Sequence, residues 1–472
     1  MSNIYSLPPS ELAQEAVKHV IHKPFWQSTI ENHQTQMIPP NLRTDVLVVG
    51  GGFTGLWSAV QLRLRYPSLR VALVDKSTFA GEATSRNGGF IHSTLTHGFE
   101  NSLQHWPDET STLIDLGNKN FSAIKSFIAE NHIECDWIDA GELETALLPS
   151  QIAELERQVE LANSLGLGWQ FLDFESTQQK IHNPQLLAAS FDPHGVATMN
   201  PAKLALGLVK YLEREGVELF QHTEVTKITR SNGTIVTTHS GGEIHSSKVI
   251  VASGAHFFVH PLTRMRTIPI YDYSIVSRVL HPEELQLLGW QGEEGVIDTG
   301  NQFHYYRLTP DRRILWGGYA ANYHFGSAIN ESLTYQQQEF AQLAQDFFAL
   351  FPNLKHIHFE YAWGGVIDTC SRFVPFFQTS HRGQVVQAAG FTGLGVATSR
   401  FAADVMIDLI FGETTERTAL DMVKSKPVPF PPEPLRSLSI WLTRASLLHE
   451  DRTGKRNLWL RLLDLLGVGF DS

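Results

Sequence analysis

Residues 44–75 read TDVLVVGGGFTGLWSAVQLRLRYPSLRVALVD, and this stretch decides the fold. The apolar run 46–49 predicts a buried strand, because it is rich in β-branched residues and ends at a glycine cluster. A helical apolar pattern follows the glycines and stops at Pro67. A second buried strand is predicted over 71–74, directly before Asp75. The order strand, glycine turn, helix, strand is typical of a doubly wound α/β domain.

The glycine turn has the spacing of a dinucleotide-binding motif. Gly50 allows the tight turn, Gly52 lets a pyrophosphate approach the backbone, and Gly55 lets the helix pack closely on the strand. The N–H groups and the positive dipole end of the helix hold the phosphates. Asp75 lies 20 residues after Gly55, where a carboxylate accepts hydrogen bonds from ribose hydroxyls. These parts predict binding of an adenine dinucleotide, and a tight turn in an unrelated α/β domain is the alternative.

Two further segments favour FAD over NAD. Residues 84–90, TSRNGGF, form a polar, glycine-bearing loop soon after the second strand. Residues 385–395, VVQAAGFTGLG, predict another strand and glycine turn before the helical pattern VATSRFAADVMIDLI. The positive end of that helix dipole suits an electron-rich ring rather than a phosphate.

Composition limits the other classes. A chain of 472 residues predicts two or three domains, and its net charge of −12 argues against a nucleic-acid-binding surface. The two cysteines, Cys135 and Cys370, exclude a disulfide framework and a multi-cysteine zinc or iron–sulfur site. They fit a reducing cytoplasm, where we expect the protein, and no targeting or membrane-spanning segment is expected. The 21 histidines contain no H-E-x-x-H motif, so no metal site is expected.

An ordered set of motifs resembles the FAD-dependent oxidoreductases of the D-amino-acid oxidase, glycine oxidase and sarcosine oxidase family. Within that family, the chain is most similar to the γ-glutamylputrescine oxidase-like branch. The motifs, spread over roughly residues 20–425, are VVGGGFTGL…VD, SRNGG, NPAKL (200–204), KVIVASGAH (248–256), WGGVIDTCSRFVPF (363–376) and GFTGLGV (390–396).

The resemblance implies an α/β fold with a Rossmann-like FAD-binding domain and a helical C-terminal tail. A substrate domain of the α+β type, built on an antiparallel sheet, would be interleaved with the FAD-binding domain. The FAD-binding domain would take residues 1–110, 190–260 and 360–425, and the substrate domain 111–189 and 261–359.

The resemblance also implies which residues hold FAD. The ADP half would contact Gly50, Gly52, Phe53, Thr54, Gly55, Asp75, Lys76, Val225 and Gly254, and the isoalloxazine would contact Ser85, Arg86, Asn87, Gly88, Gly393, Leu394 and Gly395. Some relatives attach FAD through a histidine in the loop after the second strand, or through a cysteine in the WGG region. The loop GEATSRNGG has no histidine and Cys370 lies beyond that cysteine position, so non-covalent FAD is expected.

The implied reaction is oxidation of a C–N bond in an amine or amino acid. A neutral amine would place its C–H over flavin N5, a hydride would leave, and the imine would hydrolyse. Oxygen or another acceptor would reoxidise the flavin. Oxidation of a CH–OH substrate, such as a 2-hydroxy acid or glycerol 3-phosphate, is the alternative enzyme class. A nicotinamide-dependent dehydrogenase would not explain GFTGLG, and a flavoprotein scaffold or sensor is the non-enzymatic alternative.

Residues 302–318 predict a hairpin-like strand pair that carries substrate determinants. In amino-acid-oxidising relatives an arginine near here pairs with the substrate carboxylate. Thr309 stands at that position, and Arg307 would share its strand face. Arg307, Tyr306 and His97 are the candidate catalytic residues, and His97 would help to deprotonate the amine. The alternatives are a solvated or salt-bridged Arg307, with a substrate that lacks an α-carboxylate, and a packing role for His97.

Residues 426–472 form a distinct tail. KPVPFPPEP predicts an extended linker, and 435–450 and 457–470 predict two amphipathic helices. The tail has a local charge of +2 on a chain of −12. One interpretation is packing against the body or a sister subunit, and the other is peripheral contact with a membrane near a respiratory acceptor. The oligomeric state stays open.

Overall fold

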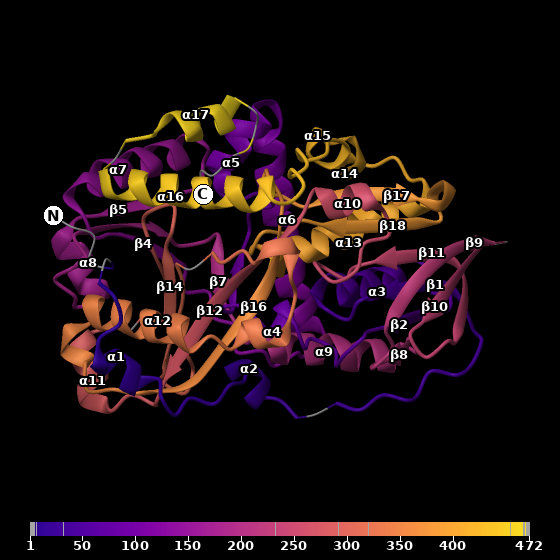
Figure 1. The fold of residues 1–472 in the computed structure, drawn as a ribbon, viewed down its shortest axis with the longest axis horizontal. Coiled ribbons are helices and arrows are strands. Elements are labelled where there is room, and N and C mark those ends of the chain that lie inside the picture. The colour runs from indigo at the N-terminus through magenta and orange to yellow at the C-terminus, as the bar shows by residue number, and fades with distance from the viewer. Residues whose placement is uncertain are drawn as a thin grey trace.

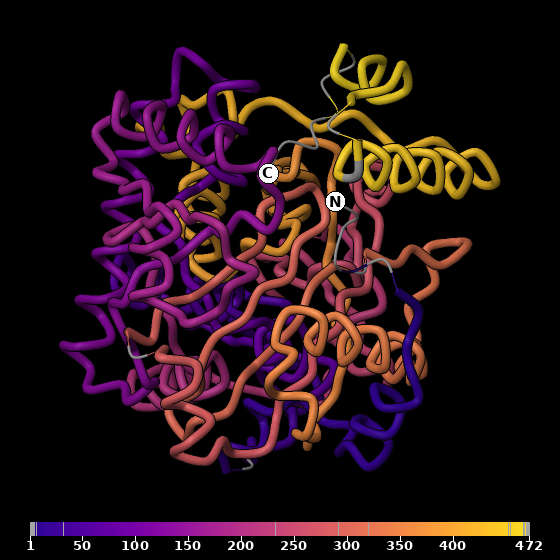
Figure 2. The backbone as a smooth tube through the Cα atoms, turned by 90° about the vertical axis from the view of Figure 1, so that its left-hand side faces the viewer, coloured from indigo at the N-terminus to yellow at the C-terminus, as the bar shows by residue number. Residues whose placement is uncertain are grey.

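The computed structural model describes residues 5, 7–31, 33–231, 233–290, 292–319, 321–453, 455–465 and 468. Two large β-sheets lie next to each other with helices around them (Figure 1). The tail helices lie together at one corner of the molecule, as the yellow part of the tube in Figure 2 shows. The predicted α/β architecture is confirmed.

The first sheet contains the dinucleotide-binding motif of residues 44–75. Strand β1 (Leu42–Val49), helix α3 (Phe53–Arg65) and strand β2 (Val71–Val74) follow the predicted order. Strand β1 pairs in parallel with both β2 and β11. Every residue of β2 is buried, which is why its sequence is continuously apolar rather than alternating. The other strands of this sheet are β8 (Glu218–Phe220), β9 (Val225–Ser231), β10 (Gly233–Thr238), β11 (Glu243–Val251), β17 (Phe376–Ser380) and β18 (Val385–Ala389).

Helix α3 packs against helix α13 (Gly395–Phe411), and both helices contact this sheet. The close contact of α3 with the glycine turn depends on Gly55, because a Cβ there would lie 1.8 Å from the Gly50 carbonyl oxygen. The apolar residues of α3 and α13 belong to one core cluster with β1 and β2. The predicted strand, glycine turn and helix at 385–410 are therefore confirmed as β18 and α13.

The second sheet runs in the order β16-β12-β15-β14-β13-β4-β6-β5. Its pairings are antiparallel, as expected, except that β13 and β4 pair in parallel. Its strands are β4 (Glu142–Ala146), β5 (Gln170–Leu172), β6 (Ala188–Asp192), β12 (Ile268–Ser277), β13 (Gly295–Asp298), β14 (His304–Leu308), β15 (Ile314–Gly318) and β16 (Phe359–Thr369). The predicted hairpin in 302–318 is the β14–β15 pair. A small separate pair joins β3 (Phe90–His92) to β7 (Val196–Thr198).

Three segments pack in the core of the other domain from the one to which the expected division assigned them. Helix α6 (Thr110–Glu130) packs on α13 in the first core, because its apolar stripe faces that helix. Helix α1 (Glu11–Ala16) packs on α12 (Gln337–Leu350) in the second core. Strand β16 hydrogen-bonds to β12 along most of its length, so it belongs to the second sheet although the expected boundary stood at residue 360.

The remaining helices connect or cover the two sheets. They are α2 (Phe25–Ser28), α4 (Ala83–Arg86), α5 (Gly98–His105), α7 (Pro149–Ser164), α8 (Phe174–Lys180), α9 (Pro201–Arg214), α10 (Pro261–Met265), α11 (Pro282–Leu288), α14 (Glu416–Ala419) and α15 (Asp421–Lys424).

The tail forms helices α16 (Leu435–Thr453) and α17 (Leu458–Leu465), after a linker without helix or strand. Most of the expected extension to residue 470 lies outside the described residues. The tail packs against the body, since the Asp451 carboxylate accepts hydrogen bonds from the backbone N–H of Asn301 (3.0 Å) and from its side-chain amide (2.7 Å). None of the helices described is long and apolar enough to cross a membrane.

Candidate functional site

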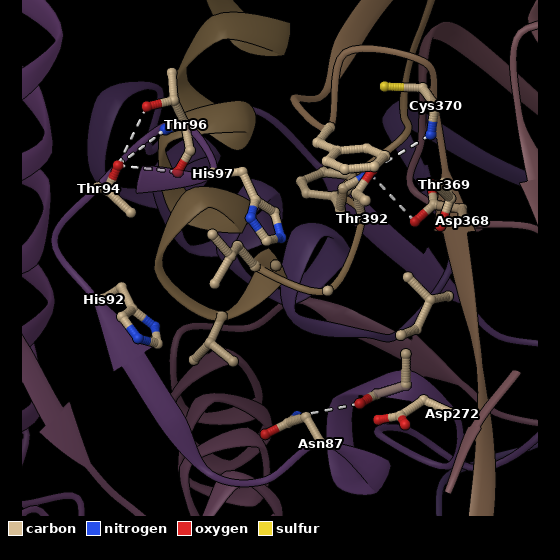
Figure 3. Close-up of a pocket in the computed structure, with 18 of the residues that line it drawn as sticks. Asn87, His92, Thr94, Thr96, His97, Asp272, Asp368, Thr369, Cys370 and Thr392 are labelled. Atoms are coloured by element: carbon tan, nitrogen blue, oxygen red, sulfur yellow. Dashed lines mark hydrogen bonds between the residues drawn. The ribbon is translucent and has the colours of Figure 1, made fainter. Parts of the chain in front are cut away.

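A cavity of about 1640 Å³ lies between the two sheets. One end is formed by the glycine turn after β1, and the other by the face of β12, β14 and β16. Residues of α16 and α17 complete its wall, so the tail takes part in the cavity. Figure 3 shows part of the lining, with Asp272 and Asn87 at one end and His97 and Thr392 across from them.

Most residues expected to hold FAD line this one cavity. Those that line it are Gly50, Gly52, Phe53, Thr54, Asp75, Lys76, Arg86, Asn87, Gly88, Val225, Gly254, Gly393, Leu394 and Gly395. Two expected contacts do not line it. Gly55 serves the packing of α3 on the turn, and Ser85 is buried, with its Oγ accepting a hydrogen bond from the Gln27 amide at 2.9 Å.

The dinucleotide end has the shape that the motif predicts. The Asp75 carboxylate accepts hydrogen bonds from the N–H groups of Gly51 (2.6 Å) and Ser77 (2.7 Å), which fixes it beside the turn. Burial raises the pKa of Asp75, and these two N–H groups oppose that rise. Helix α3 begins at this wall without a side-chain cap from Gly52, so the helix dipole favours an anionic group here.

The opposite end of the cradle fits a flat ring system. A Cβ at Gly393 would meet no atom within 4 Å, so this glycine borders open space. Helix α13 begins there, and its N-cap residue Leu394 provides no side-chain cap. Two long helices thus present uncapped N-termini to one cavity. This arrangement fits FAD, whose pyrophosphate is anionic and whose ring takes up electron density.

The loop at residues 86–89 is fixed against the second sheet. The Arg86 guanidinium donates to the carbonyl of Gly364 (2.8 Å), and the Trp363 indole N–H donates to the carbonyl of Arg86 (2.9 Å). The Trp26 indole N–H donates to the carbonyl of Asn87 (2.8 Å). The loop therefore holds a defined position at the boundary between the two ends of the cavity.

A polar group on the second sheet faces the same loop. The Tyr305 hydroxyl donates to the Asp272 carboxylate at 2.7 Å and lies 3.0 Å from Ser274 Oγ. The Tyr305 ring packs on Gly88, where a Cβ would lie 2.8 Å from the ring. Burial raises the pKa of Asp272 to about 6, while the Tyr305 hydrogen bond lowers it. Both Asp272 and Tyr305 line the cavity, and the sequence analysis named neither of them.

The structure corrects the expectation for Tyr306. Its side chain is fully buried on the other face of β14, where it packs on Trp316 with 4.8 Å between ring centroids. Side chains alternate along a strand, so the cavity face is taken by Tyr305 instead. Tyr306 is a core residue and does not line the cavity.

The structure also corrects the expectation for Arg307. Its guanidinium is fully buried and donates from one Nη1 to the carbonyls of Gly89 (2.9 Å) and Met199 (3.0 Å). It does not line the cavity, so it is not placed to hold a substrate carboxylate. It is also fully buried rather than solvated, and no described carboxylate lies within 4.0 Å of it, so the alternative interpretation is wrong as well. Arg307 instead ties the loop at Gly89 to the segment before α9.

This placement of Arg307 leads to a stability prediction. Arg307→Ala is expected to lower the free energy of unfolding by about 2–5 kcal/mol, because the Met199 carbonyl loses its donor, the Gly89 carbonyl keeps only the Met199 N–H, and a cavity is left. Arg312→Ala, on the same hairpin with a half-exposed side chain, is the control and is expected to change it by less than about 0.5 kcal/mol. Urea unfolding measures both. A stable Arg307→Ala protein with a raised KM would contradict the assignment.

His97 does line the cavity, as expected for a substrate contact. Burial lowers its pKa to about 4, so the imidazole is neutral at pH 7 and is able to accept a hydrogen bond. His92 lies on the same wall, with its Nε2 at 3.2 Å from a Glu142 carboxylate oxygen. A role for His97 in deprotonating the amine stays a prediction.

Cys370 is fully buried beside the cavity. Its Sγ lies 3.2 Å from the carbonyl of Val374 and 3.4 Å from that of Gly390. Burial raises the pKa of this thiol, and the thiolate is the nucleophilic form. The environment therefore disfavours a covalent bond to a flavin. Among the described residues, no group of three or more His, Cys, Asp or Glu side chains is arranged to hold a metal ion.

Known proteins are similar to this chain in sequence and in fold. The chain is 26% identical over 421 residues to the probable oxidoreductase OrdL of Rhizobium meliloti (strain 1021), covering 86% of this chain and 91% of that protein. It is 26% identical over 396 residues to gamma-glutamylputrescine oxidoreductase of Escherichia coli (strain K12), covering 82% and 88%. Its fold matches glycine oxidase from Geobacillus kaustophilus with a TM-score of 0.67 at 19% identity, covering 82% and 100%. The model of the DAO family, described as FAD dependent oxidoreductase, matches residues 45–409, and the chain belongs to this family of FAD-dependent enzymes.

Proposed function

We propose that the protein oxidises a C–N bond of a small amine or amino acid, with FAD bound non-covalently. The observation that carries this proposal is the Asp272–Tyr305 pair, which stands on the cavity wall beside the loop at Gly88. A carboxylate at that place pairs with an ammonium group and accepts its proton, which leaves the neutral amine that oxidation requires.

Each residue near the pair has a distinct task in this proposal. When bound, FAD supplies the acceptor for the hydride that leaves the substrate carbon. Asp272 binds the ammonium and takes its proton. Tyr305 holds the Asp272 carboxylate at 2.7 Å and restricts its rotation. His97, neutral at pH 7, lines the opposite wall and accepts a hydrogen bond from the substrate side.

Further parts of the proposal rest on other observations. Non-covalent attachment is supported by the buried, hydrogen-bonded Cys370 thiol and by the absence of histidine from residues 81–89. A cytoplasmic location is supported by free thiols at both cysteines. The electron acceptor is oxygen or another oxidant.

The test is the visible spectrum of the purified protein before and after anaerobic addition of amines, amino acids and hydroxy acids. We expect a flavin spectrum, release of the flavin by acid precipitation, and bleaching by at least one amine or amino acid. Bleaching by a hydroxy acid alone would replace the proposal with CH–OH oxidation. A colourless protein that cannot be reconstituted with FAD would contradict it altogether.

A further inference from the structure

We propose that Arg444, on the tail helix α16, binds a carboxylate of the substrate, so that the amine oxidised here is one that bears an acidic group. This inference rests on the proposed function, since it names the class of amine. It assigns to the tail a direct part in substrate recognition.

The first observation is the charge balance of the cavity wall. Among the described residues, the Lys and Arg side chains that line the cavity are Lys76, Arg86, Lys125 and Arg444. Lys76 and Arg86 each lie 3.8 Å from Glu82, and Lys125 lies 2.6 Å from Asp139. Arg444 has no described carboxylate within 4.0 Å, so its charge is the one in this set without an anionic partner.

The second observation is the way in which Arg444 is held. The Arg444 Nη1 donates a hydrogen bond to the neutral Oδ1 of Asn322 at 2.7 Å. This bond orients the guanidinium and leaves most of its N–H donors available. The neighbouring Thr443 accepts a hydrogen bond from the Trp459 indole at 2.9 Å, which ties α16 to α17. Arg436 donates to Ser327 Oγ at 2.9 Å and fixes the start of α16. The arginine is thus positioned before a ligand arrives, which lowers the entropic cost of binding.

The third observation relates Arg444 to the Asp272–Tyr305 pair. The backbones of Asn322 and Tyr271 exchange N–H···O bonds of 2.8 and 3.0 Å. The residue that orients Arg444 is therefore paired with the residue directly before Asp272. Since Arg444 and Asp272 line one cavity, a molecule bound there is offered a carboxylate for its ammonium and a guanidinium for its carboxylate.

In the part of the chain that the structure describes, the second sheet provides no cation of its own on the cavity side of β14 and β15. Arg307 is buried away from the cavity, and Thr309 is buried with its hydroxyl donating to Asp311 at 2.6 Å. No described arginine or lysine of β14 or β15 lines the cavity. A planar guanidinium binds a carboxylate with two parallel hydrogen bonds, so Arg444 supplies from the tail what the sheet lacks.

The test compares two amines that differ only in a carboxylate, namely the amino compound that bleaches the flavin best and its decarboxylated counterpart. Arg444→Gln is expected to raise KM for the carboxylate-bearing amine by about 10–100-fold, with the rate at saturation changed by less than about threefold. KM for the decarboxylated amine is expected to change by less than twofold. Arg444→Lys, which keeps the charge but loses the fork, is expected to recover part of the affinity.

Arg461→Gln is the matched control, because Arg461 is an exposed arginine of α17 that does not line the cavity. A second readout is titration of the oxidised holoenzyme with benzoate, followed by the flavin absorption band. Benzoate is expected to bind the wild type and the control and to bind Arg444→Gln at least tenfold more weakly.

The possible results separate this inference from the proposed function. If no amine or amino acid bleaches the flavin, the proposed function fails, and the benzoate titration still tests Arg444 as an anion site. If amines bleach it but Arg444→Gln affects both members of the pair equally, or neither, the inference is wrong and the proposed function stands. Thermal unfolding checks that each variant is folded. If Arg444→Gln does not fold, the same comparison is made with Arg444→Lys.

Discussion

Replacing Asp272 with asparagine is expected to slow anaerobic flavin reduction by the best amine by about 10²–10⁴-fold. Asparagine keeps the size of the side chain and can still accept the Tyr305 hydrogen bond, but it takes no proton from an ammonium group. Stopped-flow absorbance of the flavin measures the rate. Asp115→Asn, at an exposed position of α6, is the control and is expected to leave the rate unchanged.

The pH profile provides a separate check on Asp272. Burial raises its pKa to about 6, and the ionised form is the one that accepts the proton. The wild-type rate is therefore expected to fall as the pH drops through about 6, approaching tenfold per pH unit, and this limb is expected to vanish in Asp272→Asn. The groups that act on the carboxylate are the Tyr305 hydroxyl, the backbone N–H groups of Tyr273 and Gly318 and the charge of His304. A retained limb, or a fall in rate below fivefold, would contradict the role of Asp272.

Replacing Gly55 with alanine is expected to abolish FAD binding and to lower the free energy of unfolding by more than about 4 kcal/mol. The added Cβ would lie 1.8 Å from the Gly50 carbonyl oxygen, and this atom belongs to the backbone of the phosphate turn itself. Helix α3 has to move off β1, which carries the turn and the helix N-terminus away from the cavity. The ratio of flavin to protein and urea unfolding measure the two effects.

Gly242→Ala is the control for this substitution. A Cβ at Gly242 would meet the Thr238 hydroxyl at 3.2 Å, and this side chain is able to give way. We expect a change of less than about 1 kcal/mol and a full flavin content. A Gly55→Ala protein that purifies with stoichiometric FAD would show that the close contact of α3 with the turn is not required.

Local sequence was sufficient for the dinucleotide half of the molecule. The apolar runs at 46–49 and 71–74 predict buried parallel strands, because strands covered on both faces have to be apolar throughout, and both runs form such strands. The glycine turn and Asp75 stand at fixed distances along that unit. The position of the dinucleotide turn therefore followed from spacing alone, and the pattern at 385–410 predicted the second helix N-terminus at Gly395.

The sequence by itself determined the dinucleotide turn and the two tail helices, because each depends on a pattern within a few tens of residues, and the ordered set of motifs along the chain indicated the family. Only the tertiary structure decided which face of β14 meets the cavity. Both faces of this strand are almost completely buried, so alternation separates Tyr305 from Tyr306 without showing which one faces the substrate. Only the tertiary structure showed that Arg444 lies in the cavity wall with the second sheet. Its partner Asn322 is more than a hundred residues away in the chain, and local periodicity does not predict such a contact.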